Sequence, residues 1–146
     1  MNRTKTATRI LSVLAALFLL LASLTACSGG ITREEAKTAM DSLLTALDNE
    51  NYTEAAALYH PDAAMSENLL AAFAGQIKTK VGIDLTEGAV VEKITGMSSS
   101  YYDSNVDGSR YVLTARIKAG DKTASLTVEV IRNGKGYGIF KVECNP

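Results

Sequence analysis

The sequence predicts an α+β fold in which three helices precede a four-stranded antiparallel sheet. In the first half of the chain, apolar residues recur every three or four positions, which is the spacing of one helix face. After Gly88 this spacing gives way to alternation of apolar and polar residues, which is typical of strands with one buried face. The turn signals Gly120-Asp121 and Asn133-Gly134 separate alternating segments and favour antiparallel hairpins.

The first residues have the features of a secretory signal. Arg3, Lys5 and Arg9 precede an apolar stretch that runs from Ile10 to Leu24. This stretch has 15 residues, which is short against the roughly 20 that a membrane-spanning helix needs. A cleaved leader is therefore the preferred interpretation.

Leu24-Thr25-Ala26-Cys27 resembles the lipobox of bacterial lipoprotein precursors, whose leader is cut before a cysteine that carries the lipid. The resemblance implies a signal peptide at 1–26, lipid attachment at Cys27 and a lipidated tether at 27–31. Two or more acyl chains, such as palmitate, hold a protein firmly because each buried CH₂ contributes about 0.8 kcal/mol. We therefore expect a protein anchored by lipid at the extracytoplasmic face of the cell membrane. An uncleaved anchor helix and plain secretion are the alternatives.

Composition limits the remaining part of the chain to a single α+β domain at 32–146. The leader holds three of the 15 basic residues and none of the 16 acidic ones, so residues 27–146 carry a net charge of about −4 (12 bases minus 16 acids). This charge excludes a general nucleic-acid binder, which would have a basic excess. With Cys27 alkylated, Cys144 has no partner for a disulfide, and we expect it to be a small core residue.

Three helices are predicted in the first half of this domain. Thr32 and Glu35 have the spacing of a capping box, so the first helix should begin at Arg33. The second should run from Tyr52 to Tyr59, because the residue before Pro61 is pushed out of helical geometry. The third should extend from about Ser66 to about Lys80. The apolar stripe of the first helix consists of Ala36, Ala39, Met40, Leu43, Leu44 and Leu47.

Four strands are predicted in the second half. They are Gly88 to Tyr101, Arg110 to Ala119, Lys122 to Arg132 and Lys135 to Cys144. A longer polar loop from Asp103 to Gly108 should join the first two strands. Alternation places Glu129 and Glu143 on the solvent-facing side of the sheet.

The order of three helices and a four-strand meander resembles the cone-shaped fold of the nuclear-transport-factor-two-like superfamily, and in particular bacterial lipoproteins of that type. The residues that carry the resemblance are 48–56, Leu58-Tyr59-His60-Pro61-Asp62 and the closing Gly138-Ile139-Phe140-Lys141-Val142. It implies that the helices close the concave side of a curved sheet, with a pocket between the two layers. Some members are isomerases or hydrolases, and many are binding or dimerising modules.

The residues favour binding over catalysis. An isomerase site would need a carboxylate base facing a tyrosine or a protonated acid in an apolar pocket, and no such set is visible in the sequence. His60 is the only histidine, which excludes a metal site built on several imidazoles. We expect His60 to cap helix carbonyls, and we expect no metal and no cofactor.

Four aromatic residues are the candidates for a pocket or an interface: Tyr59, Phe73, Tyr101 and Tyr111. Core packing is the alternative role for them. The expected function is a lipid-anchored binding domain without catalysis, whose partner is the membrane together with an unknown small molecule or protein, or a second copy in a homodimer. The alternative is a small pocket enzyme of the isomerase or hydrolase kind.

Overall fold

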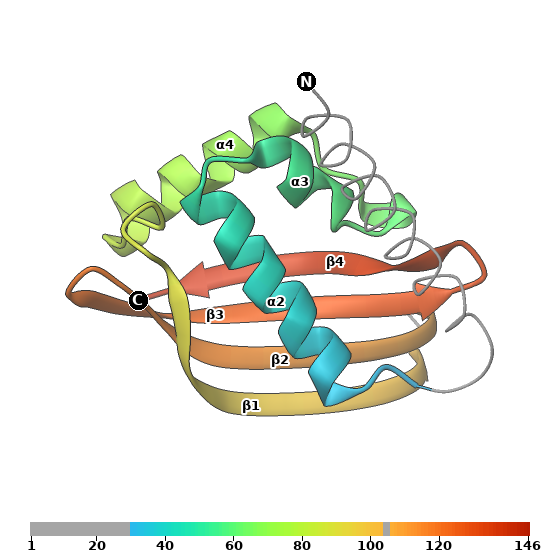
Figure 1. Ribbon diagram of the computed structural model, residues 1–146. Coiled ribbons are helices and arrows are strands. Elements are labelled where there is room, and N and C mark those ends of the chain that lie inside the picture. Colours follow the sequence, from blue (N-terminus) through green and yellow to red (C-terminus); the bar gives the residue numbers. More distant parts are fainter. Residues whose placement is uncertain (1–29, 104–105) are drawn as a thin grey trace, which may run out of the picture.

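The computed structural model describes residues 30–103 and 106–146, without the side chains of residues 101–107. A single four-stranded antiparallel sheet has the strand order β1-β2-β3-β4, and three α-helices lie on one side of it (Figure 1). The predicted α+β class and the four-stranded antiparallel sheet are confirmed. The leader, the tether before Gly30 and Cys27 lie outside the described residues.

The helix α2 (Arg33–Asp48) begins where the capping box predicts. The Thr32 hydroxyl accepts from the Glu35 N–H, and the Glu35 carboxylate accepts from the Thr32 N–H, so two donors of the first turn are satisfied. The whole predicted apolar stripe is buried. Capping and amphipathic spacing therefore explain both the start of α2 and the face that it turns to the sheet.

The segment between α2 and the sheet contains two short turns that were not predicted, η1 and η2. The helix α3 (Tyr52–Ala57) ends two residues early, and a short 3-10 turn η1 (Pro61–Ala63) follows it. The helix α4 (Glu67–Gln76) is capped by Ser66 and continues as a π-turn η2 (Ile77–Val81), which ends at Gly82. The third helix was expected to end at about Lys80, and Val81 completes the wider turn before Gly82.

The strands are β1 (Val90–Asp103), β2 (Val106–Ala119), β3 (Lys122–Asn133) and β4 (Gly136–Asn145). The long loop predicted from Asp103 to Gly108 is wrong, because Asp103 pairs with Val106 and β2 begins four residues before Arg110. Polar composition misled the prediction, since backbone pairing continues wherever a polar residue faces solvent. The predicted Gly120-Asp121 turn joins β2 to β3, whereas the turn between β3 and β4 is Gly134-Lys135, one residue later than predicted.

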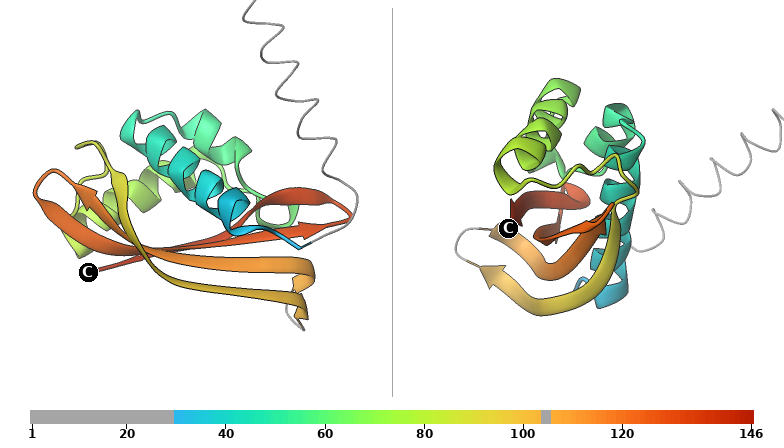
Figure 2. Two further views of the ribbon diagram at one scale, coloured as in Figure 1. Left: turned by 60° about the horizontal axis from the view of Figure 1, so that its bottom comes forward. Right: turned by 90° about the vertical axis from the view of Figure 1, so that its left-hand side faces the viewer.

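The core lies between the helices and the concave side of the curved sheet (Figure 2). Met40, Leu43, Leu44 and Leu47 of α2 are at most 2 % exposed and belong to the same buried cluster as Leu113, Val128 and Ile139 of the sheet. Burial of each such side chain contributes roughly 1.5–3 kcal/mol. Within the described ranges, no helix is both long and apolar enough to cross a membrane.

Candidate functional site

The helix α2 connects two ends of the molecule that differ in chemistry. Its first turn is hydrogen-bonded to Arg132 and Tyr137, which flank the β3–β4 turn. Its last turn lies near the loop before β1 (Figure 1). We call residues 31–36, 60–62 and 132–137 the entry pole, because the chain enters the fold there. Residues 48–50, 78, 82–88 and 119–122 form the distal pole. The 16 residues of α2 span about 24 Å between the two.

Three side chains of the entry pole join α2 to the β3–β4 hairpin. Arg132 Nη2 donates to Glu35 Oε1 at 2.6 Å. The Arg132 guanidinium also lies 5.0 Å from the ring centroid of Tyr137, a cation–π distance. Tyr137 Oη donates to the backbone carbonyl of Glu35 at 3.0 Å. Glu35 therefore caps its own helix and holds the hairpin at the same time.

These contacts change the pKa of two side chains, Glu35 and Tyr137. Partial burial alone would raise the pKa of Glu35, but the Thr32 backbone donor and the Arg132 guanidinium outweigh it and lower that pKa. Burial, with the nearby charge of Glu35, raises the pKa of Tyr137 to about 12. At neutral pH the carboxylate is therefore ionised and the phenol keeps its proton, as the observed hydrogen bonds require.

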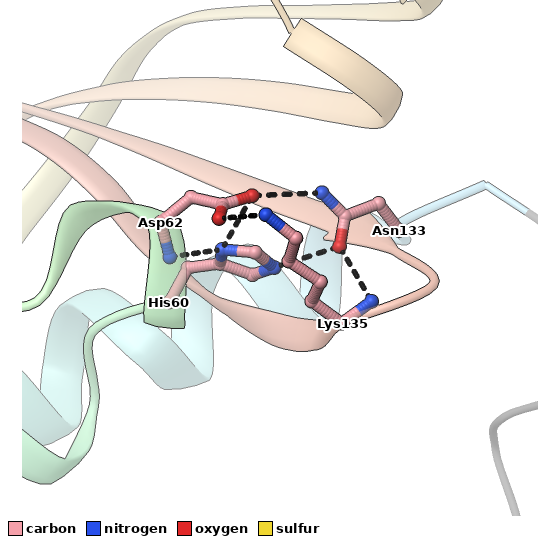
Figure 3. Close-up of polar contacts among 4 residues, drawn as sticks. All are labelled: His60, Asp62, Asn133 and Lys135. Atoms are coloured by element: carbon pink, nitrogen blue, oxygen red, sulfur yellow. Dashed lines mark hydrogen bonds and ion pairs between the residues drawn. The ribbon is translucent and has the colours of Figure 1, made fainter.

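The other side of the hairpin is held by a polar cluster around His60 (Figure 3). His60 is fully buried. Its Nε2 lies 3.0 Å from Asn133 Oδ1, and its Nδ1 accepts from the Asp62 N–H at 3.0 Å. Asn133 Oδ1 also accepts from the Lys135 N–H, and Lys135 Nζ pairs with Asp62 Oδ1. The cluster links the segment before α4 to the β3–β4 turn.

The hydrogen bonds assign the tautomer of His60. Because Nδ1 accepts a backbone N–H, the ring proton resides on Nε2 and is donated to the side-chain oxygen of Asn133. The prediction that His60 caps carbonyls is wrong, since the ring accepts at the start of η1. Hydrogen bonding from Lys135 is the main cause that lowers the pKa of Asp62.

The backbone beside His60 extends the sheet. Tyr59 forms a parallel bridge with Ile139, the His60 N–H donates to Ile139 O, and the Ile139 N–H donates to Leu58 O. Gly138 makes this approach feasible, because a Cβ at that position would lie 2.5 Å from the His60 nitrogen. Gly138 is therefore a position at which two backbone segments pack closely.

The distal pole contains two adjoining depressions of about 350 Å³ and 190 Å³. Both are lined by Lys78 and Asp84, which form an ion pair of 2.5 Å. The first also involves Glu87 and Asp121, and the second lies beside Tyr52. Within the distal pole, Asp48, Glu50, Asp84, Glu87 and Asp121 outnumber Lys78 and Lys122. The surface of the depressions is thus polar, with an excess of negative charge.

Local hydrogen bonds fix the acidic side chains and the loops of the distal pole. The Lys78 ammonium, followed by the hydroxyl and N–H of Thr86, lowers the pKa of Asp84 to about 2. Asp48 Oδ1 accepts from the Gly88 N–H at 2.8 Å, and the Gly120 N–H donates to Glu87 O. These bonds tie the end of α2, the loop before β1 and the β2–β3 turn into one unit.

Of the aromatic candidates, Tyr59, Phe73 and Tyr111 line neither depression. Tyr111 is 7 % exposed in the core, and its hydroxyl donates to Met97 Sδ at 3.5 Å. Tyr59 and Phe73 are half-buried and pack against the core from the helical layer. Burial raises the pKa of Tyr59 to about 12. The side chain of Tyr101 lies outside the described part of the chain.

Glu129 lies on the predicted face of the sheet, but it is not solvent-exposed. Its neighbours Val128 and Val130 are fully buried in the core, so its side chain points to the opposite face. There Arg110 Nε and Nη2 donate to its two oxygens at 2.7 and 3.0 Å, and Glu129 is 7 % exposed. The carboxylate is thus neutralised by a bidentate arginine, the opposite of a proton acceptor in an apolar pocket.

The paired side chains of the two poles were not predicted as functional candidates. Glu35 and Arg132 are 97 positions apart, and His60 and Asn133 are 73 positions apart. No local spacing could have indicated these pairs. Over residues 30–103 and 106–146, His, Cys, Asp and Glu side chains form no group of three that could hold a metal ion.

Comparisons with known proteins give a likeness of fold. A scan against models of protein families finds no match, and a search of curated proteins also finds none. Among solved structures, the chain is similar to an NTF2-like protein with a cystatin-like fold from Novosphingobium aromaticivorans. The two share 14 % sequence identity and a TM-score of 0.46, over 91 % of this chain and 86 % of the other. At this level the likeness says nothing about function.

Proposed function

We propose that the protein is a lipid-anchored extracytoplasmic binding domain of the NTF2-like type, without catalysis. Cys27 would hold it to the membrane, and the distal pole would meet the ligand or partner. The observation that carries the proposal is the arrangement of the two ends of α2. The chain enters at one end, and the depressions lie about 24 Å away at the other.

The entry pole is suited to hold a tethered domain. Ile31 is 6 % exposed and Thr32 caps α2, so the fold begins four residues after Cys27. The ion pair of Arg132 with Glu35 connects that start directly to the sheet. A pull on the tether is therefore transmitted to the hairpin as well as to the end of a helix.

The anchor is tested by two cysteine substitutions in the full chain. Cys27→Ser removes the thiol that would form the thioether, so we expect the protein to leave the membrane pellet or to remain as a precursor with its leader. Cys144→Ser is the matched control and should stay in the pellet. Intact mass of the membrane-extracted protein should show an acylated chain that begins at Cys27. An unmodified cysteine there, or a Cys27→Ser protein that still matures and sediments, overturns the proposal.

The binding role is tested at the distal pole. Since acidic side chains exceed basic ones there, we expect a tetralysine peptide to raise the thermal midpoint of the purified full chain, and a tetraglutamate peptide to leave it unchanged. Glu87→Lys should abolish that rise. Arg116→Ala, on the outer face of the sheet, is the control. An equal shift in the Glu87→Lys variant would place the binding elsewhere.

A further inference from the structure

We propose that the entry pole rests on the headgroup surface of the membrane, so that α2 stands upright and carries the distal pole away from the lipid. This inference rests on the proposed function, because it needs the lipid on Cys27. It adds an orientation and a contact surface to that function. The proposed contact of the entry pole is the lipid headgroup layer.

The covalent reach of the chain limits how far the entry pole can be from the bilayer. Cys27 and Ile31 are four residues apart, so their Cα atoms are separated by at most about 14 Å. The headgroup region itself is about 5–8 Å deep on each side of the bilayer. Since Ile31 is already buried in the fold, the first turn of α2 lies within contact range of the headgroups.

The charges of the two poles favour this orientation. In the entry pole, Arg33, Arg132 and Lys135 balance Glu34, Glu35 and Asp62. The distal pole has an excess of acids. An anionic membrane surface repels negative charge within about a Debye length, roughly 8–10 Å. The electrically balanced end can therefore lie on the lipid, while the acidic end is driven away from it.

The surface chemistry of the β3–β4 turn also suits a lipid interface. Tyr137 is 38 % exposed, and its ring lies on the Arg132 guanidinium. Tyrosine and arginine have an apolar body with a polar tip, the chemistry that settles at headgroup depth. Gly134 and Gly136 are exposed beside Tyr137 and lack side chains that would hold the turn away from the surface.

Tryptophan fluorescence can test the contact because the chain contains no tryptophan. The full lipidated chain would be reconstituted into phosphatidylethanolamine–phosphatidylglycerol vesicles that contain a headgroup-attached nitroxide quencher. Gly134→Trp is the main reporter, since a Cβ there meets nothing within 4 Å, and Tyr137→Trp is a second. Lys122→Trp, which is exposed in the distal pole, is the matched control.

The two entry-pole reporters should lose emission in quencher vesicles relative to quencher-free vesicles, and Lys122→Trp should not. Equal loss at both poles, or greater loss at Lys122→Trp, overturns the orientation. Flotation of the same samples separates this failure from failure of the anchor. A chain that does not float with the vesicles and lacks acyl mass refutes the proposed function, and the orientation with it. A chain that floats with the reverse quenching pattern refutes the orientation alone.

Discussion

Arg132 and Glu35 form an ion pair of 2.6 Å that joins the end of β3 to the first turn of α2. The two side chains are 20 % and 30 % exposed, so solvent screens their attraction only in part. Glu35 also completes the capping box, and Arg132 also supports the ring of Tyr137. The Glu35 carboxylate thus caps α2 and also connects this helix to the end of β3.

Arg132→Ala should lower the free energy of unfolding by about 1–2 kcal/mol, because it removes a charge-assisted hydrogen bond and a cation–π contact. Urea denaturation of the full chain in detergent measures this loss. Lys141→Ala is the control. Its partner Glu143 is exposed, so solvent screens the pair and the change should leave the stability almost unaltered. Equal effects of the two substitutions would contradict the role given to Arg132.

His60→Ala should be more damaging, at about 3 kcal/mol, because it leaves a cavity and removes two hydrogen bonds of a buried side chain. The affected groups are the Asp62 N–H and the Asn133 side-chain oxygen. Asn133→Ala removes one of these bonds from the other side. In a double-mutant cycle the two losses should not add, and strict additivity would show that the observed hydrogen bond contributes nothing.

Gly138→Ala and Gly134→Ala form a matched pair in the same hairpin. A Cβ at Gly138 would lie 2.5 Å from the His60 nitrogen, whereas a Cβ at Gly134 meets nothing within 4 Å. The first substitution should therefore cost about 1–3 kcal/mol through forced backbone displacement, and the second should be nearly neutral. Thermal denaturation of both variants checks the difference. A neutral Gly138→Ala would mean that the Tyr59–Ile139 bridge yields easily.

The features that the sequence predicts well depend on short spacings. Thr32 and Glu35 are three residues apart, and their capping box fixes the start of α2. The Gly120-Asp121 turn fixes the register of β2 and β3, and alternation places Glu129 on the correct face of β3. In each case the interacting groups belong to one element or to two elements joined by one turn.

The errors about Glu129, His60 and the depressions have one physical origin, which is contact between side chains of different segments. Arg110 covers Glu129 from the neighbouring strand, so the expected exposure is wrong although the face is right. His60 was assigned to the end of α3, but Asn133 and the start of η1 use its ring instead. The depressions of the distal pole combine three separate segments. Spacing within one segment contains no information about such partners.

Cys144 should react slowly with thiol reagents in the folded protein. Burial raises the pKa of this thiol to about 11, so at neutral pH almost no thiolate is present. Alkylation by iodoacetamide should be slow in the folded chain and fast in guanidinium chloride. If Cys27 is acylated as proposed, the unfolded chain should show one reactive thiol. Two reactive thiols would contradict the anchor, and fast labelling of the folded chain would contradict the burial of Cys144.

Tyr137 should make the entry pole sensitive to alkaline pH. Its folded pKa of about 12 exceeds the ordinary value of about 10, because burial and Glu35 disfavour the phenolate. A raised pKa means that the unfolded chain loses the proton first. The stabilisation is therefore complete below about pH 10 and disappears as the pH rises through about 12.

Denaturation midpoints measured from pH 8 upward should fall in this range, and Tyr137→Phe should flatten that part of the decline. Tyr59 also has a pKa of about 12, so the decline should be flattened further in the double variant with Tyr59→Phe. If the midpoint falls by the same amount in the wild-type protein and in both variants, groups other than these two tyrosines cause the decline.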